Sequence, residues 1–276
     1  MRTIAVINRK GGSGKTTTAV NTAAAIAETQ APVLLIDMDP QGSASDWLAR
    51  AGDARGFGEA FRQTYDLGRL AMRTDVPGLD IVPSSDWLVT AERSMQGELS
   101  LGISRSLRRL APRWPVVIID CPPSLSYLTI GVLMGVRELL IPVEAHAMAL
   151  SGADAIIDEL PSVRDLNPDL RTTHMLPCRV TRTVHARDVV ETMTADYPTM
   201  VTQTRIRESI RLAEAADMQQ PITRYAPRSA GSIDYRAFAR ELLDARPGPP
   251  SAVTTDDPHS GSWLRSLVGR AAGDPR

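Results

Sequence analysis

Short apolar runs alternate with alanine-rich or amphipathic stretches along most of the 276-residue chain. The apolar runs, several of them rich in β-branched residues, are typical of strands buried on both faces of a parallel sheet. They lie at 3–7, 33–36, 79–82, 116–119, 138–142 and 174–179. Helical patterns lie at 19–27, 149–160, 186–195 and 231–245. This order predicts an α/β fold with a doubly wound, mostly parallel sheet flanked by helices.

Two segments depart from this alternation. Residues 51–77 are less regular and are punctuated by glycine, which indicates a variable helical excursion rather than a second domain. After Arg246 the chain becomes rich in proline, glycine and polar residues, which predicts a flexible linker. We therefore expect one domain over 1–246 and a tail over 247–276. A short amphipathic segment of this tail would place four apolar side chains on one side, Trp263, Leu264, Leu267 and Val268.

The first apolar run leads into a loop of glycines and lysines, Lys10-Gly11-Gly12-Ser13-Gly14-Lys15-Thr16-Thr17, before a helical pattern. Glycines let successive backbone N–H groups turn toward one centre. Lys15 would place its ammonium against the outer phosphates of a nucleotide, and Thr16 would offer its hydroxyl to Mg²⁺. The helix that begins at Thr16 adds its positive dipole end. The strand, loop and helix together predict a P-loop that holds nucleotide phosphates.

Lys10 is an additional lysine at the front of this loop. Its charge points away from the phosphates that the loop itself would wrap. We therefore interpret Lys10 as a group that reaches a nucleotide held by a second copy of the protein.

Aspartates follow two of the predicted strands. Asp37 and Asp39 come after the run at 33–36, and Asp120 comes after the run at 116–119. Ligands of α/β sheets bind at the carboxyl edge of the strands, where these residues would lie. Asp120 is placed to hold Mg²⁺, and Asp37 and Asp39 are candidates for orienting the metal shell and the attacking water. The same aspartates could also be simple turn formers or helix caps.

With its second lysine, the loop resembles the deviant Walker A motif of the ParA and MinD type ATPases. Four other segments resemble further motifs of this family, at 37–45, 120–125, 140–144 and 206–215. The resemblance extends over about residues 1 to 245. Within the family the chain is more similar to the small ParA partition ATPases, without an extra N-terminal DNA-binding domain, than to MinD.

The resemblance implies ATP and Mg²⁺ as cofactors and a homodimer that closes when ATP binds. The implied catalytic residues are Lys10, Lys15 and Asp39, and the implied metal-binding residues are Thr16, Asp37 and Asp120. The implied nucleotide-binding residues are 10–17 of the loop, together with Pro227 and Ser229 in the loop that would cover the adenine.

The resemblance also implies partners. The ATP-bound dimer would bind DNA without sequence preference, through residues that include Arg182 and Arg211. A ParB-like or other adaptor would stimulate hydrolysis and release the dimer. The expected location is the cytoplasm, on the nucleoid, where the ATPase would segregate a plasmid, a chromosome region or another cargo.

Composition leaves DNA binding open, because 31 lysines and arginines stand against 32 acidic residues and the formal net charge is −1. Distribution is more informative. Between 205 and 240 there are seven arginines and four acidic residues, an excess that favours a phosphate-binding face. An ordinary solvated helix face of mixed charge is the alternative.

Two other function classes stay open. A membrane-associated regulator similar to MinD would use the tail for localisation, although one short apolar stripe is a weak anchor and a membrane partner is not expected. A metabolic enzyme on the same fold, such as a reductase or an ATP-dependent ligase, is disfavoured by the absence of cysteines spaced for a cluster. Cys121 is expected to be a packing residue, and the four histidines show no metal-ligand spacing.

Overall fold

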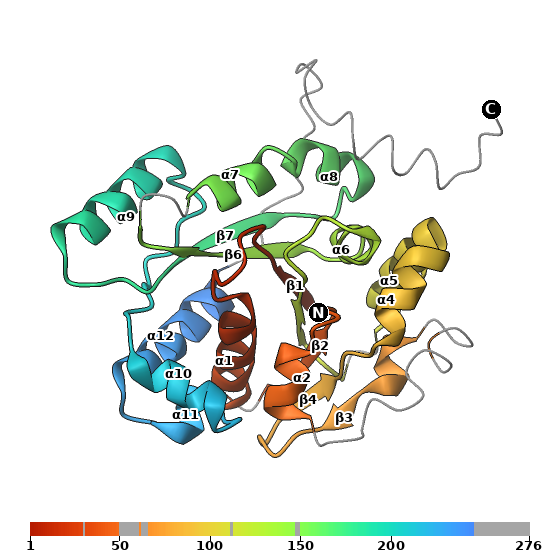
Figure 1. Cartoon of the computed structure of the whole chain (residues 1–276), viewed down its shortest axis with the longest axis horizontal. Helices are drawn as coiled ribbons and strands as arrows, with labels where there is room; N and C mark the ends of the chain where they lie inside the picture. Colours follow the sequence, from red (N-terminus) through yellow and green to blue (C-terminus); the bar gives the residue numbers. More distant parts are fainter. Residues whose placement is uncertain (30, 50–60, 62–65, 111–112, 147–149, 246–276) are drawn as a thin grey trace.

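The computed structural model describes residues 1–29, 31–49, 61, 66–110, 113–146 and 150–245. Within these residues seven strands form one sheet in the order β3-β4-β2-β5-β1-β6-β7, and helices cover both of its faces (Figure 1). The strands are β1 (Arg2–Val6), β2 (Val33–Asp37), β3 (Met72–Arg73), β4 (Leu79–Val82), β5 (Val116–Asp120), β6 (Glu138–Glu144) and β7 (Thr172–Cys178). Every pair in the sheet is parallel except β3 with β4.

The helices alternate with the strands, as the apolar pattern predicts. They are α1 (Lys15–Ala27), α2 (Ser43–Leu48), a 3₁₀ helix (Leu67–Leu70), α4 (Trp87–Ser94), α5 (Gln96–Arg109), α6 (Tyr127–Leu133), α7 (Leu150–Ile157), α8 (Leu160–Leu166), α9 (Val184–Asp196), α10 (Ile210–Asp217), α11 (Ile222–Tyr225) and α12 (Ala230–Asp244). The predicted α/β class and all six predicted strands are confirmed. The predicted helix at 149–160 ends earlier, because the chain divides there into α7 and α8.

The remaining differences fall in irregular segments. The edge strand β3 was not predicted, since two residues are too few to produce an apolar period. Of the irregular segment 51–77, the structure describes Phe61 and residues 66–77, which contain the 3₁₀ helix and β3. The tail at 247–276, with its predicted amphipathic segment, lies outside the described residues.

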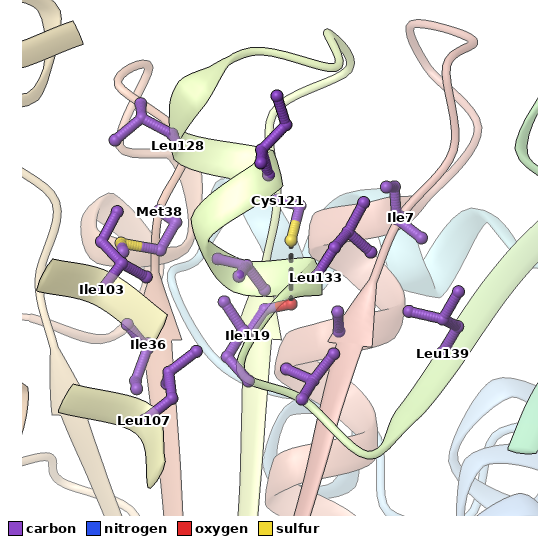
Figure 2. Close-up of a cluster of buried hydrophobic side chains, with 14 of the residues drawn as sticks. Ile7, Ile36, Met38, Ile103, Leu107, Ile119, Cys121, Leu128, Leu133 and Leu139 are labelled. Atoms are coloured by element: carbon purple, nitrogen blue, oxygen red, sulfur yellow. Dashed lines mark hydrogen bonds between the residues drawn. The ribbon is translucent and has the colours of Figure 1, made fainter. Parts of the chain in front are cut away.

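Two separate apolar layers lie on the two faces of the sheet. Successive residues of β1 face opposite sides, so Ile4 and Val6 belong to one layer while Ala5 and Ile7 belong to the other. The first layer packs against α1 and α12, and the second against α5 and α6. Figure 2 shows part of the second layer, where Cys121 lies among large aliphatic side chains. Its thiol is fully buried, which agrees with the predicted packing role, and burial raises its pKa well above the ordinary value.

Helix α6 approaches α5 very closely. A Cβ atom placed on Gly131 would lie 2.8 Å from the Cα atom of Ser100 and 2.9 Å from its carbonyl oxygen. Only glycine fits this contact without moving the backbone of α5. The close contact fixes α6, which directly follows the loop after β5.

Because the sheet is parallel, the loops after β1, β2, β5, β6 and β7 all lie at its carboxyl edge. Asp37 at the end of β2 is the register partner of Asp120 at the end of β5. Asp120 is in turn paired in register with Val6 of β1, just before the glycine-rich loop. The fold therefore brings the loop and the two aspartates together, although Asp120 lies more than a hundred residues after the loop in the sequence.

Candidate functional site

The glycine-rich loop joins β1 to α1 in a shape that leaves open space in front of it. Gly12 and Gly14 have φ angles of +74° and +82°, in the left-handed region that favours glycine. A Cβ atom on Gly11, Gly12 or Gly14 would meet nothing within 4 Å. Helix α1 follows immediately, with the amide of Thr18 donating to the carbonyl of Gly14 at 2.8 Å. Such a turn at a helix N-terminus can receive an anion.

Lys15 lies on the first turn of α1 with its side chain largely buried. Its ammonium donates to the carbonyl oxygen of Lys10 at 3.3 Å. Burial lowers the pKa of Lys15, and the carboxylates of Asp120 and Asp39 oppose that effect. A cation removed from water and only partly compensated is well suited to bind a phosphate oxygen.

Asp37 is completely buried and is held by the start of α2. Its Oδ2 atom accepts hydrogen bonds from the backbone amide of Ser45 at 2.8 Å and from the hydroxyl of Ser45 at 2.6 Å. The amide of Asp39 donates to Oδ1 at 3.2 Å. Burial nevertheless raises the pKa of Asp37 to about 6, because it outweighs the hydrogen bonds from Ser45.

Asp120 is also completely buried, and within the described residues neither of its carboxylate oxygens accepts a hydrogen bond. Burial and the neighbouring charge of Asp37 raise its pKa well above the ordinary value, and the hydroxyl of Thr16 lies close enough to oppose this. Buried oxygens without partners require a ligand or a proton. Thr16, Asp37 and Asp120 therefore fit a divalent cation, since Mg²⁺ prefers oxygen ligands and combines one or two carboxylates with phosphate oxygens.

Asp39 is less buried than the other two aspartates. Its Oδ1 atom accepts from the amide of Gln41 at 3.0 Å, and its carbonyl accepts from the hydroxyl of Ser84 at 2.6 Å. These contacts fix the turn after β2. Within the described residues, Oδ2 of Asp39 takes part in none of these hydrogen bonds.

We expect the raised pKa of Asp37 to appear as a pH-dependent stability difference in the free protein. The unfolded chain loses this proton near pH 4, whereas the folded protein retains it up to about pH 6. Folding stability contributed by this group therefore falls as the pH rises from 4 to 6, by about 3 kcal/mol in total. Asp37→Asn removes the titration. Urea unfolding of both proteins at several pH values, without Mg²⁺, should show the variant gaining stability relative to the parent over this interval; a constant difference would contradict the assignment.

A cavity of about 700 Å³ opens beside the glycine-rich loop, between α1, the end of β7 and α10. Its lining combines glycines with polar, charged and apolar residues, namely Gly12, Ser13, Gly14, Thr17, Thr18, Cys178, Arg179, Ile206, Arg207, Glu208, Ser209, Ile210, Leu212, Ala213, Ala216 and Tyr235. Pro227 and Ser229 are not among them. The hydroxyl of Ser229 caps α12 by accepting from the amide of Ser232 at 3.3 Å, and the carbonyl of Pro227 accepts from Arg236 at 2.6 Å.

Most residues of this cavity were not predicted as site residues. The segment 206–215 was noted because it resembles a family motif and contains arginines expected to bind DNA, not as a wall of a cavity, and Cys178 and Arg179 carried no signal of their own. They enter the site because β7 ends beside α1. Thr18 connects the two, since its hydroxyl lies 3.3 Å from the hydroxyl of Tyr235 and 3.9 Å from the thiol of Cys178.

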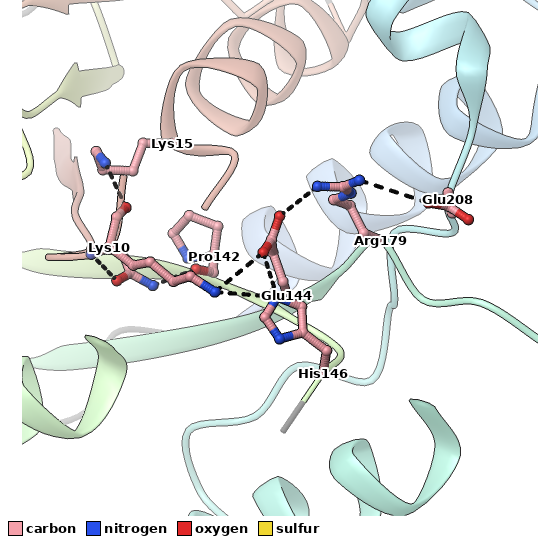
Figure 3. Close-up of polar contacts among 8 residues, drawn as sticks. Lys10, Lys15, Pro142, Glu144, His146, Arg179 and Glu208 are labelled. Carbon is pink, nitrogen blue, oxygen red and sulfur yellow. Dashed lines mark hydrogen bonds and ion pairs between the residues drawn. The ribbon is translucent and has the colours of Figure 1, made fainter. Parts of the chain in front are cut away.

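Lys10 extends toward the end of β6, where it meets Glu144 and His146 (Figure 3). Its Nζ atom is 3.6 Å from Oε2 of Glu144 and 3.2 Å from Nε2 of His146. Arg179 at the end of β7 donates to Oε1 of the same Glu144 at 2.8 Å. No sequence pattern indicates this group, because its members lie after or at the ends of three separate strands.

The arginines between 205 and 240 are less available than their number indicates. Four of the seven have partners in the structure: Arg207 with Asp234, Arg211 with Glu214, Arg224 with the carbonyl of Asp75, and Arg236 with Glu28. The other three, Arg205, Arg228 and Arg240, are exposed and have no ion pair within the described residues. Arg182 is also exposed, in the loop before α9, and Arg211 is on α10. Four of the seven arginines must therefore give up a partner within the chain before they can contact a phosphate.

Comparison with known proteins identifies the family. A family model described as "AAA domain" matches residues 1–172. The chromosome partitioning protein ParA of Myxococcus xanthus is 34% identical over 248 residues, covering 88% of this chain and 88% of that protein. The sporulation initiation inhibitor protein Soj of Bacillus subtilis is 34% identical over 245 residues, covering 87% of this chain and 97% of that protein. The chain belongs to the ParA/Soj/MinD family of deviant Walker A ATPases.

Solved structures share the P-loop NTPase-like fold of this chain. Cobyrinic acid a,c-diamide synthase from Mycobacterium smegmatis, solved with bound ADP and magnesium, has a TM-score of 0.75 and 30% identity, covering 91% of this chain and 99% of that one. Across the described part of this family member, no helix is long and apolar enough to cross a membrane.

Proposed function

We propose that this chain is a positioning ATPase that pairs with a second copy when ATP binds, attaches to DNA without sequence preference, and leaves DNA after hydrolysis stimulated by a ParB-like or other adaptor. It would act in the cytoplasm on the nucleoid and segregate a plasmid, chromosome region or other cargo. The observation that carries the proposal is the open glycine loop, which faces buried Lys15 and two buried aspartates with raised pKa values.

Residues of the glycine-rich loop and of the neighbouring strand ends would hold different parts of Mg²⁺-ATP. Backbone amides of 11–17 and the ammonium of Lys15 would bind the phosphates. Thr16, Asp37 and Asp120 would hold Mg²⁺, which neutralises phosphate charge when bound. Asp39, whose Oδ2 is available in the described structure, would orient the attacking water. Lys10 would reach the phosphates held by the second subunit.

The cavity beside the loop is the place we propose for the nucleoside. It lies next to Gly12 and Gly14, and it combines apolar walls from Ile206 and Leu212 with the polar group of Tyr235. Such a mixture of apolar walls and few polar groups is typical of small-molecule sites. Pro227 and Ser229, the residues proposed from the family resemblance, would contribute only if their loop changes position when nucleotide binds.

The proposal is tested by measuring binding to a random-sequence DNA duplex with ATP, with ADP and without nucleotide, at two salt concentrations. ATP-dependent, salt-sensitive binding that is indifferent to sequence would support it. No DNA binding in any state, together with ATP-dependent binding to anionic vesicles, would replace it with the membrane-associated alternative.

Arg211→Glu should weaken DNA binding for every sequence and reduce the slope of log affinity against log salt by about 1. In the free protein Arg211 donates to Glu214 at 2.7 Å, so it must exchange this partner for a phosphate. Arg69→Glu is a matched control, because Arg69 forms an ion pair of the same i, i+3 spacing with Asp66. Fluorescence anisotropy should separate the two variants. Equal effects would show that only net charge matters.

A further inference from the structure

The side chain of Lys10 is held at the end of β6 by its own subunit. Its ammonium contacts Nε2 of His146 and Oε2 of Glu144 at 3.2 and 3.6 Å. Its backbone is fixed as well, because its amide donates to Oδ1 of Asn8 at 2.9 Å and the amide group of Asn8 donates to the carbonyl of Pro142 at 2.8 Å. Main chain and side chain are thus both directed toward β6.

Glu144 is the centre of this group. Its carboxylate is only 7% exposed, so its charge is poorly screened by water. Burial alone would raise its pKa, but hydrogen bonds from Arg179 and His146 and the charges of Arg179 and Lys10 outweigh burial, and the pKa is lower than usual. The carboxylate is therefore a fixed negative charge that attracts Lys10.

His146 adds a second partner that depends on its proton. Nε2 lies 2.8 Å from Oε2 of Glu144 and 3.2 Å from Nζ of Lys10. Nε2 either donates to the carboxylate or accepts from the ammonium, so it serves one of them at a time. In each arrangement Lys10 has a partner within its subunit, either the imidazole nitrogen or the carboxylate.

We propose that Glu144 is a positioning residue that retains Lys10 within its own subunit and so sets how readily two subunits pair. This inference rests on the proposed function, in which Lys10 reaches the nucleotide of the partner. Lys10 must leave Glu144 before it can make that contact. The ion pair therefore stabilises the separate subunits, and ATP must overcome it to form the dimer.

The composition of the chain makes this retention directly measurable. Lys10 and Lys15 are the only lysines among the 276 residues, so few amines react with an acylating reagent. The full chain without nucleotide is treated with acetic anhydride, and acetylation of each lysine is followed by mass spectrometry. We expect Glu144→Gln to raise the acetylation rate of Lys10 about fivefold. Lys15, which contacts no atom of Glu144, should react as in the parent protein and serves as the internal reference.

Two further variants test whether the charge of Glu144, rather than a change in the fold, protects Lys10. Glu144→Asp keeps the carboxylate and should restore part of the protection of Lys10. Glu208→Gln removes the other acidic partner of Arg179, which is 3.8 Å away, without touching Lys10, and should leave acetylation unchanged. Circular dichroism and thermal melting establish that each variant is folded. A folded Glu144→Gln protein with an unchanged Lys10 rate overturns the proposal, as do equally raised rates in the Gln and Asp variants.

Dimer formation gives the second measurement. In analytical ultracentrifugation, Glu144→Gln should lower the ATP concentration for half-maximal dimer about fivefold. If acetylation rises but no variant dimerises at any ATP concentration, the proposed function fails while the retention of Lys10 is supported. If the parent protein dimerises with ATP and Glu144→Gln needs the same concentration, the role of Glu144 in pairing is overturned.

Discussion

Lys15→Ala is expected to weaken ATP binding by at least about a hundredfold, equal to about 3 kcal/mol. The ammonium of Lys15 is buried at the start of α1, between the glycine loop and two acidic side chains, and Lys10, the other lysine of the loop, is held by Glu144 and His146 instead. Removing it leaves the phosphates to face Asp120 and Asp39 without a cation from the protein. Isothermal titration calorimetry with Mg²⁺-ATP measures the loss directly.

Asp39→Ala provides the contrast for this result. Its carboxylate contributes a contact to the turn after β2 and none to the glycine loop, so the variant should bind ATP within a few-fold of the parent. Hydrolysis should instead fall by about a hundredfold, the usual scale for a residue that assists proton transfer. Strong ATP binding by Lys15→Ala, or full hydrolysis by Asp39→Ala, would contradict the proposed division of roles.

Glu138→Ala is expected to lower the free energy of unfolding by about 3–5 kcal/mol, because it breaks a buried ion pair. Glu138 at the start of β6 is 1% exposed and accepts from Arg2 through Oε1 at 2.7 Å and through Oε2 at 2.5 Å. His174 of β7 lies 3.1 Å from the same Oε2 atom. The variant leaves the guanidinium of Arg2 and the imidazole of His174 with no acidic partner in a buried position.

Asp169→Ala is the matched control for Glu138. Asp169 pairs with Arg108 at 3.6 Å, but both side chains are about half exposed, so its loss should cost less than about 1 kcal/mol. Urea denaturation of the two variants gives both values. A loss below 1 kcal/mol for Glu138→Ala would mean that water enters the pocket of Arg2 and replaces the carboxylate.

The sequence was most informative where function depends on residues close together in the chain. The loop 10–17 and the strand ends at Asp37 and Asp120 could be found because a glycine pattern or a short apolar run stands directly beside each of them. The parallel sheet then follows from the alternation of strands and helices. The register that places Asp37 opposite Asp120 confirms the expectation that both lie at one edge.

The parts that could not be predicted depend on residues that meet only in space. Glu144 was noted only as part of a segment that resembles a family motif, and a histidine without metal-ligand spacing gave no reason to connect His146 with Lys10, 136 positions away. The availability of the arginines between 205 and 240 could not be predicted for the same reason. Whether Arg207 or Arg236 is available depends on Asp234 and Glu28, which reach them through the packing of α12 against other segments.

The position of β1 in the middle of the sheet has a consequence for synthesis on the ribosome. Arg2 pairs in register with Val116 of β5, and Ile4 pairs with Glu138 of β6, so β1 is made well before both of its neighbours. Contacts of such long sequence separation form slowly. The glycine loop, which follows β1, is therefore expected to be positioned only after β5 and β6 have been translated. Until β5 and β6 have been made, the edges of β1 lack these partners, which gives a chaperone time to bind this strand.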